Sequence, residues 1–84
     1  MHYPIAIQHG DHTHAFGVMV PDLPGCFSAG DTLEEAITNA AEAIALWIED
    51  CDAFLLPVPS SVERWVNDAD CKGWTIQLVE IRPR

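Results

Sequence analysis

The thirteen Asp and Glu residues are the side chains of this 84-residue sequence with the most scope for chemistry. About four carboxylates that converge can hold the two metal ions of a hydrolytic site. The positions argue against such a site, because Asp11 falls in a turn, Asp22 in a loop, and Glu34 and Glu35 at the exposed start of a helix. No strand expected before that helix has an interior Asp or Glu. We therefore predict no catalytic or metal-binding carboxylates, and favour a solvated or partner-facing acidic surface.

Histidine and cysteine are the other candidates for chemistry. His9, His12 and His14 cluster at a predicted hairpin, where His12 and His14 could share one strand face and bind a transition metal. No nearby Cys completes the ligand set, so we favour solvated histidines. Cys26 has no basic neighbour to lower its thiol pKa and lies on an apolar strand, which predicts a buried structural thiol. We predict no cofactor and no enzyme activity.

The charge is unevenly distributed along the chain. The formal net charge is −9, and the four basic residues all lie in the last third, at Arg64, Lys72, Arg82 and Arg84. Residues 1–63 contain ten Asp or Glu and no Lys or Arg. Such a field repels phosphate backbones, so we expect no direct contact with nucleic acid. It attracts a cationic protein and speeds its docking, although acidity can also serve only to keep a small domain soluble.

Length and composition predict a single domain over residues 1–84. A chain this short buries a modest core, so an oligomer or a partner complex would add stability. We see no apolar run long enough for a membrane span and no secretion signal at the N-terminus. Three cysteines without CxxC spacing fit reduced thiols in the cytoplasm.

Alternating apolar residues predict two strands at the start of the chain, Tyr3–Gln8 and Ala15–Val20, joined by a turn at His9–His12. Gly17 in the second strand suggests a bend or a close approach of another backbone. These strands are expected to pair as antiparallel neighbours.

The segment Pro21–Gly25 interrupts the strand pattern. Pro and Gly suit a tight turn, which is the structural role that we favour. The turn could also present Asp22 and an exposed Leu23 to a partner at low entropic cost. A short third strand, Cys26–Ala29, follows the turn.

A long helix is the clearest element of the sequence. Thr32 followed by Glu35 forms a capping box, and Asp31 adds negative charge at the positive end of the helix. Apolar residues recur at helical spacing over five turns, at Leu33, Ala36, Ile37, Ala40, Ala41, Ile44, Trp47, Ile48 and Cys51. This pattern predicts a helix with one broad apolar face that packs on a sheet.

The last third of the chain predicts one short helix and one strand. Pro57 and Pro59 favour extended backbone, and Ser60 could cap a short helix through Val66. Trp65 and Trp74 flank a polar connector and could complete the core or form part of an interface. The strand Trp74–Ile81 closes the order β-β-β-α-(short α)-β. We expect an α+β two-layer sandwich whose last strand is parallel to an earlier one after a right-handed crossover.

The run from Val20 to Ala36 contains Pro-Asp-Leu-Pro-Gly and then Gly-Asp-Thr-Leu-Glu-Glu-Ala. This run resembles the signature of HicB-type antitoxins, in which a strand ending in PDLPG precedes a short strand and a GDT-x-EEA helix start. The similarity continues through residues 39–43 and 57–61 to the last strand, so it covers nearly the whole chain.

The resemblance implies a partial RNase H-like fold and a partner, a small basic HicA-type toxin that cleaves messenger RNA and is neutralised by covering its active site. It also implies a homo-oligomer, a dimer or a tetramer. Family members often carry a C-terminal DNA-binding segment, and we expect none within residues 1–84. The alternatives are an orphan HicB-like module that binds another protein and a metal-dependent RNase H-like nuclease. The expected partner contacts are Asp22, Leu23, Asp31, Glu34, Glu35 and Trp65.

Overall fold

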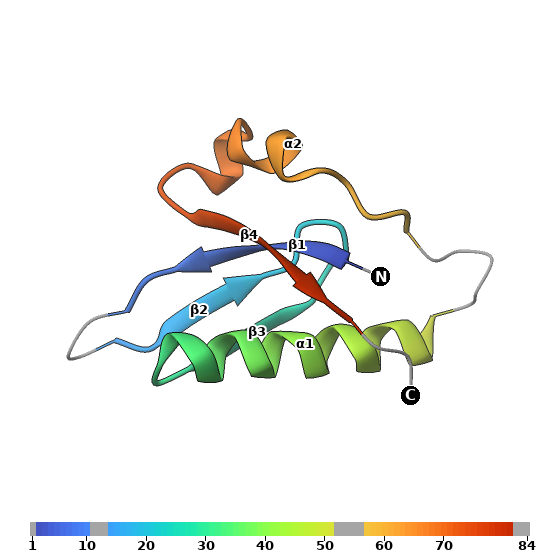
Figure 1. Ribbon diagram of the computed structural model, residues 1–84, viewed down its shortest axis with the longest axis horizontal. Coiled ribbons are helices and arrows are strands. Elements are labelled where there is room, and N and C mark those ends of the chain that lie inside the picture. Colours follow the sequence, from blue (N-terminus) through green and yellow to red (C-terminus); the bar gives the residue numbers. More distant parts are fainter. Residues whose placement is uncertain (1, 11–13, 52–56, 82–84) are drawn as a thin grey trace.

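The computed structural model describes residues 2–10, 14–51 and 57–81 (Figure 1). Its elements follow in the order β1 (His2–Gln8), β2 (Phe16–Met19), β3 (Phe27–Gly30), α1 (Leu33–Asp50), α2 (Val62–Val66), the 3-10 helix η2 (Ala69–Cys71) and β4 (Thr75–Glu80). The predicted α+β class and element order are confirmed. The polar connector that was predicted after the short helix contains η2.

The four strands form one sheet in the order β3-β2-β1-β4, and every neighbouring pair is antiparallel. The expectation that β4 pairs in parallel is therefore wrong. A helix that led directly from β3 into a strand would make that strand parallel to β3. Here the chain crosses the molecule once along α1 and a second time through the segment with α2, as Figure 1 shows, so β4 enters the sheet from the opposite end.

Local sequence accounts for where α1 begins. The Thr32 Oγ1 accepts a hydrogen bond from the Glu35 backbone N–H at 3.1 Å, and the Thr32 carbonyl accepts one from Ala36 at 2.9 Å. The helix buries Ala36, Ala40 and Ile44 against the sheet. None of the described helices is long and apolar enough to cross a membrane.

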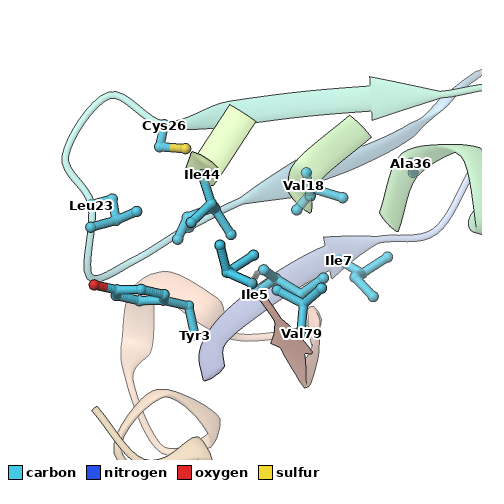
Figure 2. Packing of buried hydrophobic residues seen from close by; sticks show 12 residues of the cluster. Tyr3, Ile5, Ile7, Val18, Leu23, Cys26, Ala36, Ile44 and Val79 are labelled. Carbon is cyan, nitrogen blue, oxygen red and sulfur yellow. The ribbon is translucent and has the colours of Figure 1, made fainter. Parts of the chain in front are cut away.

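The core lies between α1 and one face of the sheet (Figure 2). Tyr3, Ile5 and Ile7 point into it from alternate positions of β1, and Ile44 meets them from the helix. Burial of each such large side chain contributes roughly 1.5–3 kcal/mol of hydrophobic stabilisation. The pattern of alternating residues in the strand thus selects the face that α1 covers.

The second face of β1 is also covered. Pro4 and Ala6 point away from α1 and are nevertheless fully buried. The helix α2 contacts β4 and β1 and lies on the opposite side of the sheet from α1 (Figure 1). The Tyr3 hydroxyl donates a hydrogen bond to the Pro57 carbonyl at 3.0 Å, which ties the second crossing to the sheet.

Two glycines in neighbouring strands have different surroundings. A Cβ added to Gly30 would lie 2.5 Å from the backbone nitrogen of Ala36, because the first turn of α1 packs directly on β3. A Cβ added to Gly17 would meet only the Gln8 side chain, at 3.7 Å. The close backbone approach that was considered at Gly17 therefore occurs at Gly30.

Candidate protein-binding site

The outward side of α1 is acidic along its whole length. Its exposed residues recur about every four positions, and we call them the acidic face of α1: Glu34, Glu35, Thr38, Glu42, Leu46, Glu49 and Asp50. The helix contains no Lys or Arg, and Asp31 extends the exposed negative surface beyond its N-terminus. This surface can bind a cationic protein through charge and through one apolar contact.

The two ends of the acidic face differ in what they do for the helix. Glu34 and Glu35 lie in the first turn, where negative charge offsets the positive end of the helix dipole. Asp50 lies in the last turn, where negative charge is unfavourable to the helix dipole, and that turn itself contains no basic residue. The helix dipole therefore favours Glu34 and Glu35 at the start of α1 and does not favour Asp50 at its end.

Leu46 is a member of the acidic face that sequence reasoning missed. Its side chain is 51% exposed, and it is flanked along the helix by acidic residues. The signal was available, because Leu46 follows Glu42 by four positions and so lies on the polar side of the wheel. Interfaces between proteins commonly have an apolar centre within a polar rim, and Leu46 supplies one apolar side chain on this face.

Three predicted contacts, Asp31, Glu34 and Glu35, lie together at the N-terminus of α1 and are exposed. The structure does not bring the other three predicted contacts to this cluster. A role in binding stays a prediction for the three exposed acids. Asp22, Leu23 and Trp65 lie in other parts of the structure.

Asp22 ties the loop after β2 to the second crossing of the chain. Its Oδ2 accepts a hydrogen bond from the Ser60 backbone N–H at 2.9 Å, and its Oδ1 accepts one from the Ser60 hydroxyl at 2.6 Å. Ser60 was expected to cap the short helix, and the adjacent Ser61 does so, since its hydroxyl accepts from the Arg64 N–H. The carboxylate of Asp22 thus holds two segments together.

We expect Asp22→Ala to lower the free energy of unfolding by about 1–3 kcal/mol, because it leaves the Ser60 donors without their acceptor. Urea unfolding of the variant and the parent chain measures this loss. Asp22→Asn keeps one carbonyl acceptor and should lose less. Equal stability of all three chains would show that the contact contributes nothing.

The expected exposure of Leu23 is wrong, since its side chain is fully buried. Its backbone N–H donates to the Val20 carbonyl, and its carbonyl accepts from the Cys26 N–H, each at 3.0 Å. This tight turn directs the Leu23 side chain into the core near Tyr3 and Ile44 (Figure 2). Leu23 consequently cannot contact a partner without leaving the core.

Trp65 lies on α2, on the other side of the sheet from the acidic face of α1 (Figure 1). The Arg64 guanidinium lies 4.8 Å from the centroid of its ring, within the range of a cation–π contact. The indole Nε1 is buried and has no hydrogen-bond partner among the described residues. One partner that contacts both Trp65 and Glu34 would have to extend around the edge of the sheet.

The histidines and cysteines form no cluster within the described residues. His9 Nε2 lies 2.9 Å from the Thr75 hydroxyl, and its ring meets Phe16 edge-on; His12 falls outside the described residues. Cys26 is buried, as predicted, and burial raises the pKa of its thiol. In the described ranges, no three His, Cys, Asp or Glu side chains are grouped so that they could hold a metal ion.

Comparisons with known proteins converge on one family. Residues 3–84 match the family model described as HicB-like antitoxin of bacterial toxin-antitoxin system. The chain is 38% identical to the matching chain of a HicA3 and HicB3 toxin-antitoxin complex, with a TM-score of 0.82 over 99% of this chain and 100% of that one. It is 32% identical to the N-terminal domain of the Burkholderia pseudomallei antitoxin HicB, with a TM-score of 0.78 over 98% and 99% of the two chains.

A curated relative extends the similarity to a phage. An uncharacterized 14.9 kDa protein in the rep-hol intergenic region of Haemophilus phage HP1 is 42% identical over 83 residues. The match covers 96% of this chain and 61% of the phage protein. The chain therefore spans about three fifths of the length of that relative.

Proposed function

The chain belongs to the family of HicB-like antitoxins of bacterial toxin-antitoxin systems, and from this membership we propose that it binds and neutralises a basic HicA-type toxin that cleaves RNA. The observation that supports the proposal is the acidic face of α1. It presents a continuous negative surface on a rigid element, with Leu46 exposed in its second half.

The proposed contact depends mainly on attraction between opposite charges and to a lesser extent on apolar packing. The net charge of −9 steers a cationic toxin toward the chain, and the acidic face gives it a place to dock. Asp50 is unfavourably placed at the C-terminal end of the α1 dipole, and a partner that neutralises its charge gives a reason for its presence. Inhibition then follows because the bound chain covers the toxin's RNA-binding surface.

The proposed role is inhibitory and requires no chemistry by this chain. We also propose that it acts in the cytoplasm, where messenger RNA is present and where free thiols such as those of Cys26, Cys51 and Cys71 persist. We further propose that the chain self-associates, because a sheet with two edge strands offers surfaces for pairing.

A binding titration against salt tests the proposed contact. The toxin is sought in the neighbouring reading frame as a short basic protein with a central histidine. Calorimetry at low and at high ionic strength should show an affinity that falls as salt rises, since salt screens exposed charge pairs. An affinity that is constant or rises with salt would contradict docking on the acidic face.

A second arm addresses the nuclease alternative. RNA is incubated with the chain alone and Mg²⁺, without toxin. The proposal predicts intact RNA. Cleavage that is abolished by Asp22→Asn or Glu35→Gln would establish a metal-dependent nuclease in place of an inhibitor.

Asp50→Asn should change stability and toxin affinity in opposite directions. Removing negative charge from the C-terminal turn of α1 should raise the free energy of unfolding by about 0.3–1 kcal/mol, while the toxin complex becomes weaker. Glu34→Gln is the matched variant at the other end, where the same change should lower stability and also weaken binding. Unfolding and binding titrations measure both effects. Unchanged binding of the Asp50 variant would remove the end of α1 from the toxin contact.

A further inference from the structure

The last turns of α1 extend beyond the part of the helix that is buried. Ile44 is the last buried residue of α1, and the helix continues to Asp50. Its C-cap, Cys51, has an extended backbone (φ −91°, ψ 139°) in place of the left-handed glycine that commonly closes a helix. Asp50 also opposes the helix dipole in this turn. The end of α1 therefore depends on tertiary contacts to keep its position.

Trp47 supplies such a contact. Its indole Nε1 donates a hydrogen bond to the Pro24 carbonyl at 3.1 Å. The ring is partly buried and packs against the core. Trp47 is adjacent to Leu46 in the helix and lies three residues before Asp50. The hydrogen bond consequently fixes the part of the acidic face of α1 to which these two residues belong.

The orientation of the Pro24 carbonyl follows from the turn that contains it. The Cys26 N–H donates to the Leu23 carbonyl at 3.0 Å, and Gly25 has a φ of 78°. These features define a type II turn with Pro24 and Gly25 at its centre. In a type I turn both central residues have negative φ, and the peptide between them is turned over relative to a type II turn. Gly25 therefore selects the orientation in which the Pro24 carbonyl can meet Trp47.

The same turn is fixed to the body of the domain. The side chain of Leu23 is fully buried in the core (Figure 2). The Asp22 carboxylate accepts the two hydrogen bonds from Ser60. The Pro24 carbonyl thus belongs to a rigid segment, and a hydrogen bond to it restricts the movement of the helix end.

We propose that Trp47 is a positioning residue for toxin binding, and that the Pro24–Gly25 turn holds it so that Leu46 and Asp50 are already in place when the toxin docks. This inference rests on the proposed function. An end of α1 that is ordered beforehand loses less conformational freedom on binding. Loss of the tether should weaken toxin binding by about two- to tenfold, the range for one neutral hydrogen bond.

Gly25→Ala and Gly73→Ala form a matched pair that tests the tether in the free chain. The two glycines have φ of 78° and 84°, and a Cβ added to either would meet nothing within 4 Å. Alanine is strained at positive φ, so both variants should lose stability to a similar extent. Only Gly25→Ala should release the Trp47 indole. NMR should show faster hydrogen exchange of this indole N–H in Gly25→Ala and the parent rate in Gly73→Ala, with Trp47→Phe assigning the resonance.

Calorimetric titration with the toxin tests the effect on binding. Gly25→Ala and Trp47→Phe should each bind about two- to tenfold more weakly than the parent chain. Combining them should add little, because both remove the same hydrogen bond. Gly73→Ala should bind like the parent, whereas a general loss of stability would affect both glycine variants alike. Circular dichroism checks that each variant is folded.

The outcomes separate this inference from the proposed function. Equal toxin affinities of Gly25→Ala and Gly73→Ala would overturn the positioning role, as would a folded Trp47→Phe that binds like the parent. Trp47→Phe keeps an aromatic ring in the core, so it provides the test even where Gly25→Ala fails to fold. Unchanged exchange of the Trp47 indole in folded Gly25→Ala would overturn the role of the turn. Failure of the parent chain to bind toxin would instead contradict the proposed function.

Discussion

Reversal of two charges on the acidic face of α1, Glu34→Lys with Glu42→Lys, is expected to weaken the toxin complex by about 100-fold. That change corresponds to about 2.8 kcal/mol, which two close charge pairs at an interface can supply. Both side chains are exposed in the free chain, so the fold should persist, although Glu34→Lys also places positive charge at the positive end of the helix dipole and should lower the unfolding midpoint. Calorimetric titration with the toxin measures the effect, and thermal unfolding of the free variant confirms that it is folded.

The control for this variant changes the same net charge at another place. Glu63→Lys with Asp70→Lys reverses two exposed acids on the segment around α2, which lies on the opposite side of the sheet. Only long-range steering should be affected, and the affinity should fall by less than about tenfold. Equal losses for the two double variants would show that net charge, and not the outer side of α1, determines binding.

Gly30→Ala adds only a methyl group, yet it is expected to lower the free energy of unfolding substantially. The added Cβ would lie 2.5 Å from the Ala36 nitrogen, and the neighbouring atoms are backbone that cannot rotate away. The first turn of α1 must then lift from β3, at a cost of about 2–3 kcal/mol. A domain of this size should consequently unfold at a temperature lower by about 10 °C or more.

Gly17→Ala is the matched change in the adjacent strand. Its Cβ would make only ordinary van der Waals contact with Gln8, and the backbone there is not left-handed. Stability should stay the same or increase by about 0.4–1 kcal/mol, because alanine reduces the freedom of the unfolded chain. Calorimetric unfolding of both variants decides the matter. A Gly30 variant as stable as the Gly17 variant would contradict the close packing of α1 on β3.

The helix and the first three strands were predictable because their signals are local. Thr32 caps the helix through atoms three residues away, and alternation in β1 needs only the adjacent residues. The direction of β4 was not predictable in this way, because it depends on how residues 57–74 cross the molecule. The same limit applies to the two glycines, whose difference arises from where α1 lies and not from the strands that contain them.

The candidate site was predictable in part. The exposure of Asp31, Glu34 and Glu35 followed from their place at the start of the helix, and their role in binding stays a prediction. Leu23 was expected to be exposed and is buried. Leu46, which is exposed, was overlooked. The turn around Leu23 closes onto the core through backbone hydrogen bonds, and such closure is not visible in a run of Pro and Gly.

The most direct test of the central claim is a titration of RNA cleavage by the toxin with this chain. We expect cleavage to fall in proportion to the added chain and to reach background at one equivalent. The Glu34→Lys, Glu42→Lys variant should require a large excess to give the same inhibition. Undiminished cleavage at a molar excess of the parent chain would contradict the account.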